Sequence, residues 1–134
     1  MTDLTTLQSL RDRVANATGP DRHADTLIAH QTDGWTIKKI GGKPHFSHPE
    51  EIPVARDGKP SNYPSYTSSI DDALAWVERA LPDDFVRIER LTRSRWQVHL
   101  EGSEGVSWAN APTPALAIIL AGLDTLIAKE KNDD

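Results

Sequence analysis

Apolar residues recur at three- and four-residue steps in four segments of the chain, a spacing typical of amphipathic helices. The best marked segment is residues 69–81, where Ser69 stands three residues before Asp72 in capping-box spacing and Pro82 ends the apolar stripe. The other predicted helices cover residues 3–18, 20–31 and 113–129. Proline stands at the start of the last two segments, where it loses no hydrogen bond.

The apolar period changes to two after the central helix, which predicts strands with one buried face. Residues 86–89 alternate between apolar and charged side chains, residues 92–94 have the composition of a turn, and residues 95–100 alternate again. A third short strand is predicted at residues 106–109, and an earlier strand at residues 35–40. The central region therefore predicts a helix followed by a hairpin that has one apolar face.

Five prolines fall within residues 43–65, and proline is excluded from helix interiors and from central strands. We therefore predict a long surface loop over about residues 41–67, with short edge pairing around Glu51 to Arg56 at most. Loops of this length are usually functional or mobile. The tail at about residues 130–134 should fray.

These elements predict an α+β fold, an α/β/α sandwich in which an antiparallel sheet of about four strands lies between helix layers, in the order α-α-β-loop-α-β-β-β-α. A chain of 134 residues with 37% hydrophobic content suits one domain over residues 1–134. The last helix is apolar well beyond one stripe, because Ile118, Ala121 and Leu126 widen it. Such a helix needs a second partner besides the sheet, either the first helices or another subunit, so we expect a homodimer or higher oligomer.

The formal charge of −5 gives the whole molecule no general attraction to nucleic acid or to an anionic membrane. The absence of cysteine excludes disulfides, thiolate metal sites and a cysteine nucleophile, and it suits a reducing cytoplasm. The N-terminal residues have no signal-peptide pattern. The apolar run at residues 115–123 is far shorter than the ~20 residues that a membrane helix needs. We therefore expect a soluble cytoplasmic protein that does not enter a membrane.

No catalytic or cofactor motif is recognisable. His45 and His48, followed by two glutamates, have the residue types of a metal site, but prolines bracket them in an extended loop where a three-residue step points side chains apart. Residues 102–105 do not form a nucleophile elbow, and the glycine pair at 41–42 opens no helix that could hold a phosphate. We predict no catalytic residue, metal or cofactor, and the protein is expected not to be an enzyme.

Aromatic residues near basic ones give one candidate site, because aromatic faces beside cationic groups suit nucleobases and phosphates. The alternatives are that the tryptophans fill the core and that the arginines keep an open sheet face in water. The hypothetical ligand-binding residues are Trp35, Lys38, Lys39, Lys43, Arg56, Tyr66, Arg93, Arg95 and Trp96.

The segment from Tyr63 to Leu74, the helix end at Leu81-Pro82, the strand that bears Trp96 and residues 111–117 resemble the phage ABA sandwich domain. The resemblance covers about residues 4–127. It implies a sheet between helix layers and a phage or prophage origin, and its motifs are caps and core positions that carry no catalytic identity.

That origin favours an accessory protein that acts on the host. The first hypothesis is a non-enzymatic anti-defence sponge that sequesters an anionic nucleotide immune signal. The alternative is a protein-interaction module that binds a host or virion protein through the last helix or the proline-rich loop. Nucleic-acid binding is less favoured, because the helix after the three strands begins without phosphate-gripping lysines, unlike that of double-stranded RNA-binding domains.

Overall fold

Helices and strands follow the order α-α-β-β-α-β-β-β-α in the computed structural model, which describes residues 4–41, 43–47, 64–102 and 105–132. For the strands of the first hairpin it describes the backbone. The helices are α1 (Leu4–Ala15), α2 (Arg22–Thr32), α3 (Ile70–Ala80) and α4 (Pro114–Asn132). The strands are β1 (Thr36–Ile40), β2 (Lys43–Ser47), β3 (Phe85–Thr92), β4 (Arg95–Gly102) and β5 (Gly105–Ala111).

Side chains cap the starts of α2, α3 and α4, and the cap predicted at Ser69 is confirmed. The Ser69 hydroxyl accepts a hydrogen bond from the Asp72 amide at 3.2 Å, and the Asp21 carboxylate accepts one from the Ala24 amide at 3.1 Å. Thr113 does the same for the Leu116 amide at 3.2 Å. Each cap satisfies a backbone donor that the first helical turn leaves without a partner.

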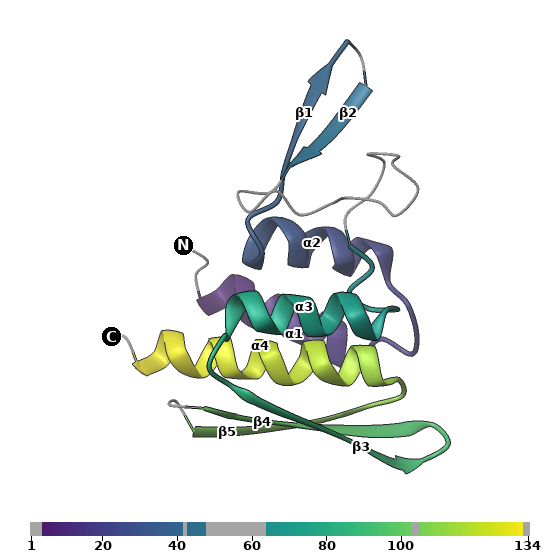
Figure 1. Cartoon of the computed structure of the whole chain (residues 1–134), viewed down its shortest axis with the longest axis vertical. Helices are drawn as coiled ribbons and strands as arrows, with labels where there is room; N and C mark the ends of the chain where they lie inside the picture. The colour runs from purple at the N-terminus through teal and green to yellow at the C-terminus, as the bar shows by residue number, and fades with distance from the viewer. Residues whose placement is uncertain (1–3, 42, 48–63, 103–104, 133–134) are drawn as a thin grey trace.

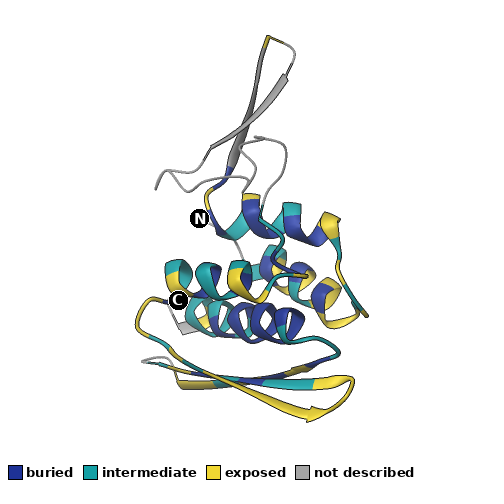
Figure 2. Ribbon diagram, turned by 45° about the vertical axis from the view of Figure 1, so that its right-hand side comes forward, coloured by how far each residue is buried: buried dark blue, intermediate teal, exposed yellow. Residues whose placement is uncertain are grey.

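Strands β3, β4 and β5 form an antiparallel sheet in that order, and α4 lies along one face of it (Figure 1). The side chains that point toward α4 include the buried Val98 and Leu100 of β4 and Ala109 and Ala111 of β5. The opposite face is exposed along most of its length (Figure 2). The sheet therefore contributes to the core through one face only.

The wide apolar surface of α4 is explained by its position between the sheet and the other helices. One side packs on β4 and β5, and the other side packs on α1 and α3, so residues 115–123 are all buried. Gly122 allows the closest approach, because a Cβ at this position would overlap the ring of the fully buried Trp76 of α3. Helix α4 thus finds both partners within the chain, and its width gives no reason to expect a second subunit there.

The predicted class is confirmed: helices pack against an antiparallel sheet. The strands are grouped differently from the prediction, because β1 pairs only with β2 in a separate two-stranded ladder. Strand β2 lies at the start of the predicted loop, and its Pro44 is tolerated because both strands of a two-stranded ladder are edges. The described helices all lie on one side of the three-stranded sheet rather than on both (Figure 1).

Candidate functional site

Two aromatic residues of the predicted ligand site, Trp35 and Tyr66, are buried around a single carboxylate. Asp33 follows α2, and its Oδ2 accepts hydrogen bonds from the Tyr66 hydroxyl at 2.5 Å and from Trp35 Nε1 at 3.1 Å. Arg79 of α3 binds the same carboxylate with two bonds, at 2.9 Å from Nε and at 2.6 Å from Nη2. Burial, and then the charge of Asp33, raises the pKa of the Tyr66 phenol. These groups satisfy one another in the core and do not face a ligand.

A second buried carboxylate ties the segment before α3 to α2. Asp25 accepts a hydrogen bond from the Thr67 amide at 2.8 Å and forms an ion pair with Arg22 at 2.9 Å. The Thr67 hydroxyl accepts a bond from the Asp21 amide at 2.8 Å. Burial raises the pKa of Asp25, against the lowering effect of the bonds from Thr67 and Arg22. This cluster holds two chain segments together.

The basic residues of the predicted site fall at opposite ends of the molecule. Lys38, Lys39 and Lys43 lie on β1 and β2, at the far end of the helices from the three-stranded sheet (Figure 1). Arg93 lies in the turn between β3 and β4, and Arg95 begins β4. Arg56 lies outside the described residues. One copy of the chain does not bring these cations together.

Trp96 and Arg95 are neighbours in sequence but lie on opposite faces of the sheet, because successive strand residues alternate. Trp96 is half-buried against the core, opposite Ala111, with the Arg90 guanidinium 5.9 Å from its ring centroid. That distance is within the range of a cation–π contact. The indole is therefore already covered from two sides, and the prediction that it stacks on a ligand stays untested.

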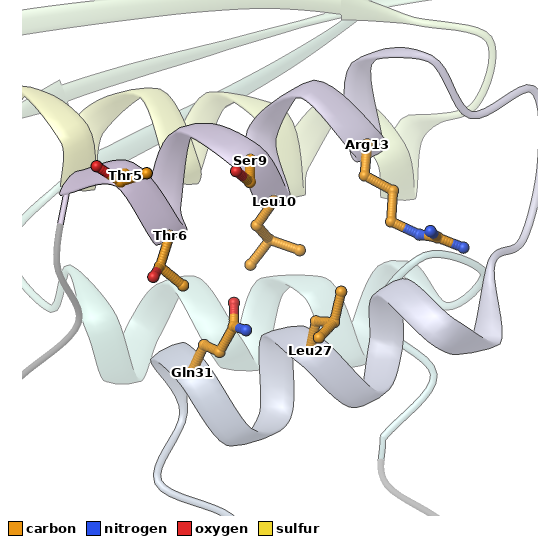
Figure 3. A pocket seen from close by; sticks show the side chains of 7 residues that line it. All are labelled: Thr5, Thr6, Ser9, Leu10, Arg13, Leu27 and Gln31. Atoms are coloured by element: carbon orange, nitrogen blue, oxygen red, sulfur yellow. The ribbon is translucent and has the colours of Figure 1, made fainter.

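A groove of about 420 Å³ lies between α1 and α2 (Figure 3). Its rim offers hydroxyl, amide and guanidinium groups around an apolar floor, from Thr5, Thr6, Ser9, Leu10, Arg13, Leu27 and Gln31. Arg13 is held by two hydrogen bonds to Asp21, at 3.0 and 3.2 Å. Arg13 is the one cation among the described residues that line the groove, and an anion entering it has to compete with that carboxylate.

The uncovered face of the three-stranded sheet carries large apolar side chains of the kind that are normally buried away from water. Phe85 is 61% exposed, Trp108 is 54% exposed and Val106 is 52% exposed. The strand register places these side chains on the side away from α4. We call this surface the open sheet face; it consists of Phe85, Arg87, Glu89, Arg95, Gln97, His99, Glu101, Val106, Trp108 and Asn110.

His99 lies at the centre of the open sheet face. Its ring stacks on the Trp108 indole with 4.1 Å between centroids and 6° between planes, and Arg87 is its cross-strand neighbour on β3. Both ring nitrogens of His99 are shielded from water and have no hydrogen-bond partner in the described part of the chain. A shielded polar atom without a partner costs about 1–3 kcal/mol, so most are found at sites with another role.

The sequence pattern leaves Trp108 among the tryptophans for which core packing is one alternative, and it does not predict the open sheet face. A signal was available, because the pairing of Gly102 with Gly105 sets Trp108 opposite His99. His99 alternates with the apolar residues Val98 and Leu100, which fixes it and Trp108 on the opposite face. The strand register, rather than the residue type, determines that Trp108 lies on the open sheet face.

The described part of the chain contains neither a cluster of metal ligands nor a membrane-spanning helix. Among the described residues, no group of three or more His, Asp or Glu side chains could hold a metal ion. His45 lies on β2, and the rest of the sequence motif, His48 with the two glutamates, falls outside the described residues. No helix in the described part of the chain has both the length and the apolar content to cross a membrane.

Comparison with known proteins gives one informative similarity. The chain is similar to a phage protein from Bacillus cereus ATCC 14579, known from a 2.0 Å crystal structure, with 26% sequence identity and a TM-score of 0.53. The match covers 82% of this chain and 94% of the Bacillus protein. No protein family and no curated protein matches the chain, so membership of the phage ABA sandwich family is not confirmed.

Proposed function

We propose that this chain is a phage- or prophage-encoded protein that works in the host cytoplasm by binding another protein, without catalysing a reaction. The observation that carries the proposal is the open sheet face. Aromatic side chains and arginine are the groups that dominate the binding energy of protein interfaces. The similarity to a phage protein supports the origin.

Contact with water is unfavourable for the apolar side chains of the open sheet face. An antiparallel sheet with one wet side normally alternates apolar and polar residues, so that its wet side is polar. Here the wet side includes Phe85, Val106 and Trp108, which are each more than half exposed. Contiguous exposed apolar surface on a small protein marks an interaction site more often than not. A partner that covers these side chains would remove the unfavourable contact with water.

The surface differs from the one that the sequence suggested for a protein partner. The last helix is buried between the sheet and α1 and α3, so its middle has no surface left to offer. The proline-rich loop lies mainly outside the described residues. The protein-binding surface that we propose is therefore the open sheet face and not the last helix.

Site-specific photo-crosslinking in the expressing bacterium tests the proposal. A p-benzoylphenylalanine placed at position 85, on the open sheet face, should give a discrete cross-linked product on irradiation. The same group at position 78, which is exposed on α3, should give none and serves as the control. Absence of a product at position 85, or equal products at both positions, would rule out the open sheet face as a protein-binding surface.

Nucleotide sequestration is the second candidate, and the α1–α2 groove is the observation that favours it. Hydroxyl and amide groups on its rim suit ribose and base edges, and Arg13 suits a phosphate if Asp21 releases it. Isothermal titration against cyclic nucleotides should give heat that disappears in Gln31→Ala and Arg13→Ala. A silent titration with the wild-type protein would exclude this candidate.

A further inference from the structure

We infer that the partner seated on the open sheet face is a second copy of this chain, in one particular two-fold arrangement. This inference rests on the proposed function, which it narrows from any protein to this one. Its support is the order of charges along the strands, which is complementary to itself when reversed.

The side chains of the open sheet face lie in rows across the strands. One row contains Phe85, Glu101 and Val106, the next contains Arg87, His99 and Trp108, and the third contains Glu89, Gln97 and Asn110. Arg95 lies beyond the third row, at the hairpin end of β4. Along the face the charges therefore alternate as Glu101, Arg87, Glu89 and Arg95.

A two-fold axis can lie between two such faces and run across the strands, midway between the second and third rows. It places each strand over its own copy and reverses the order of the rows. Arg87 then faces Glu89 of the second copy, and Glu101 faces Arg95. Because the arrangement is symmetric, each of these pairs occurs twice. Facing sheets in aligned sandwiches cross at about 30°, which displaces pairs near the axis by only a few ångströms, within reach of arginine and glutamate side chains.

The other face-to-face arrangement has its axis along the strands. It keeps β4 over β4 in the same row order, so Glu101 meets Glu101 and Arg95 meets Arg95. Like charges opposite one another are unfavourable, and they select against this register. The charge order on β4 therefore chooses between the two symmetric arrangements.

The four charged groups are free to make these contacts. In the part of the chain that the structure describes, Arg87, Glu89, Arg95 and Glu101 take part in no ion pair. By contrast, ion pairs do hold Arg11, Arg13, Arg22 and Arg79. The sheet charges therefore lose no intramolecular partner when a second copy arrives.

The size of the face sets the expected strength. Three strands about 4.8 Å apart, each with about seven residues at about 3.3 Å, give a footprint of roughly 14 by 23 Å. That is about 320 Å² per copy, well below the ~800 Å² per partner of a standard specific interface, so the dimer is expected to be weak and transient. We therefore expect a dissociation constant in the micromolar range and a dimer that appears as concentration rises.

Reciprocal charge reversal tests the register. In Arg87→Glu both Arg87–Glu89 pairs become Glu against Glu, and in Glu89→Arg both become Arg against Arg, so each variant should dimerise at least ten-fold more weakly by sedimentation equilibrium. Mixing the two variants restores opposite charges at both pairs and should give a heterodimer. The double variant should dimerise like the wild type. Arg93→Glu in the β3–β4 turn and Glu78→Arg on α3 are matched controls, because each makes the same charge change off the interface.

Each of these measurements can support or overturn the inferred dimer. A wild-type protein that stays monomeric to about 500 μM, single reversals that dimerise normally, or a mixture that does not associate would overturn the inference. The photo-crosslink at position 85 then separates the two proposals. A product containing a different protein keeps the proposed function and removes the dimer, whereas the absence of any product removes both.

Discussion

Polar groups lie beside aromatic rings in two regions of this molecule, and the two regions treat them in opposite ways. Around Asp33 the polar atoms are buried and paired: one carboxylate receives bonds from Trp35, Tyr66 and Arg79. On the open sheet face Arg87 has no ion-pair partner among the described residues, and the nitrogens of His99 have no hydrogen-bond partner there. A buried network of the first kind fixes a fold, whereas unpaired groups beside exposed aromatic rings suit binding.

The largest expected effect is at the paired region. Asp33→Ala leaves the Arg79 guanidinium, the Tyr66 hydroxyl and the Trp35 indole without their acceptor, and breaking a buried ion pair costs about 3–5 kcal/mol. Urea unfolding followed by tryptophan fluorescence measures the loss. Asp33→Asn keeps one acceptor oxygen and should lose less. A loss below about 1 kcal/mol in Asp33→Ala would show that the three donors find other partners.

The next effect tests how tightly the helical side is packed. Gly122→Ala adds a methyl group that overlaps the Trp76 ring, and overpacking costs about 1–3 kcal/mol, which exceeds the ~1 kcal/mol that alanine gains in a helix. We expect a net loss of about 1 kcal/mol in thermal or urea unfolding. The control is Gly19→Ala, where the new methyl group meets nothing. A more stable Gly122→Ala protein would contradict the close contact between α3 and α4.

A pH-dependent effect of similar or smaller size is expected at the start of α2. Burial opposes ionisation of Asp21, but hydrogen bonds from Arg13 and from the Ala24 and His23 amides outweigh it and hold its pKa below the ordinary 3.8. The stabilisation is therefore complete above pH 3.8 and is lost as pH falls through the lower folded pKa.

The variant Asp21→Ala should accordingly be less stable than the wild type by about 1 kcal/mol at pH 7, the usual worth of a helix cap. Below pH 3.8 the difference between the two proteins should shrink. Unfolding curves at a series of pH values measure it. A difference that grows on acidification would contradict the sign of the pKa shift.

The smallest effect on folding is expected at the open sheet face. Trp108→Ala removes a half-exposed ring and its stacking on His99, so the stability loss should be about 1 kcal/mol or less. Leu100→Ala, on the buried side of the same sheet, should lose about 2–5 kcal/mol. If Trp108→Ala keeps its dimer and its cross-link at position 85, the indole contributes nothing to binding.

Much of the fold could be predicted from the sequence, because local signals and tertiary packing agree. The capping spacing at Ser69, the proline after α3 and the period-two segments on β3 and β4 each specify an element without reference to the rest of the chain. The grouping of strands could not be predicted in this way. Whether β1 joins the main sheet or pairs only with β2 depends on contacts distant in sequence, and Pro44 obscured β2.

The candidate site was harder to predict, because residue type does not reveal which way a side chain points. Trp35 and Tyr66 are residue types that are common in ligand sites. In this fold they are buried in the core, next to the ion pair of Asp33 and Arg79. Asp33 lies just after α2 and Arg79 lies on α3, 46 residues apart, so neither stands out in the sequence. Trp108 shows the opposite case, in which a residue expected in the core is exposed by its register.

The bond between Tyr66 and Asp33 also makes the part of the chain that follows the buried Trp35 and precedes Ser65 a detachable insertion. The chain departs from the helices just after Asp33 and is fastened back to the same carboxylate at Tyr66, 33 residues later. Because both attachment points coincide, and because the entropy of closing a loop changes only slowly with its length, the intervening stretch can be shortened, extended or exchanged without moving α2 or α3. This geometry provides a graft position on an otherwise unaltered scaffold.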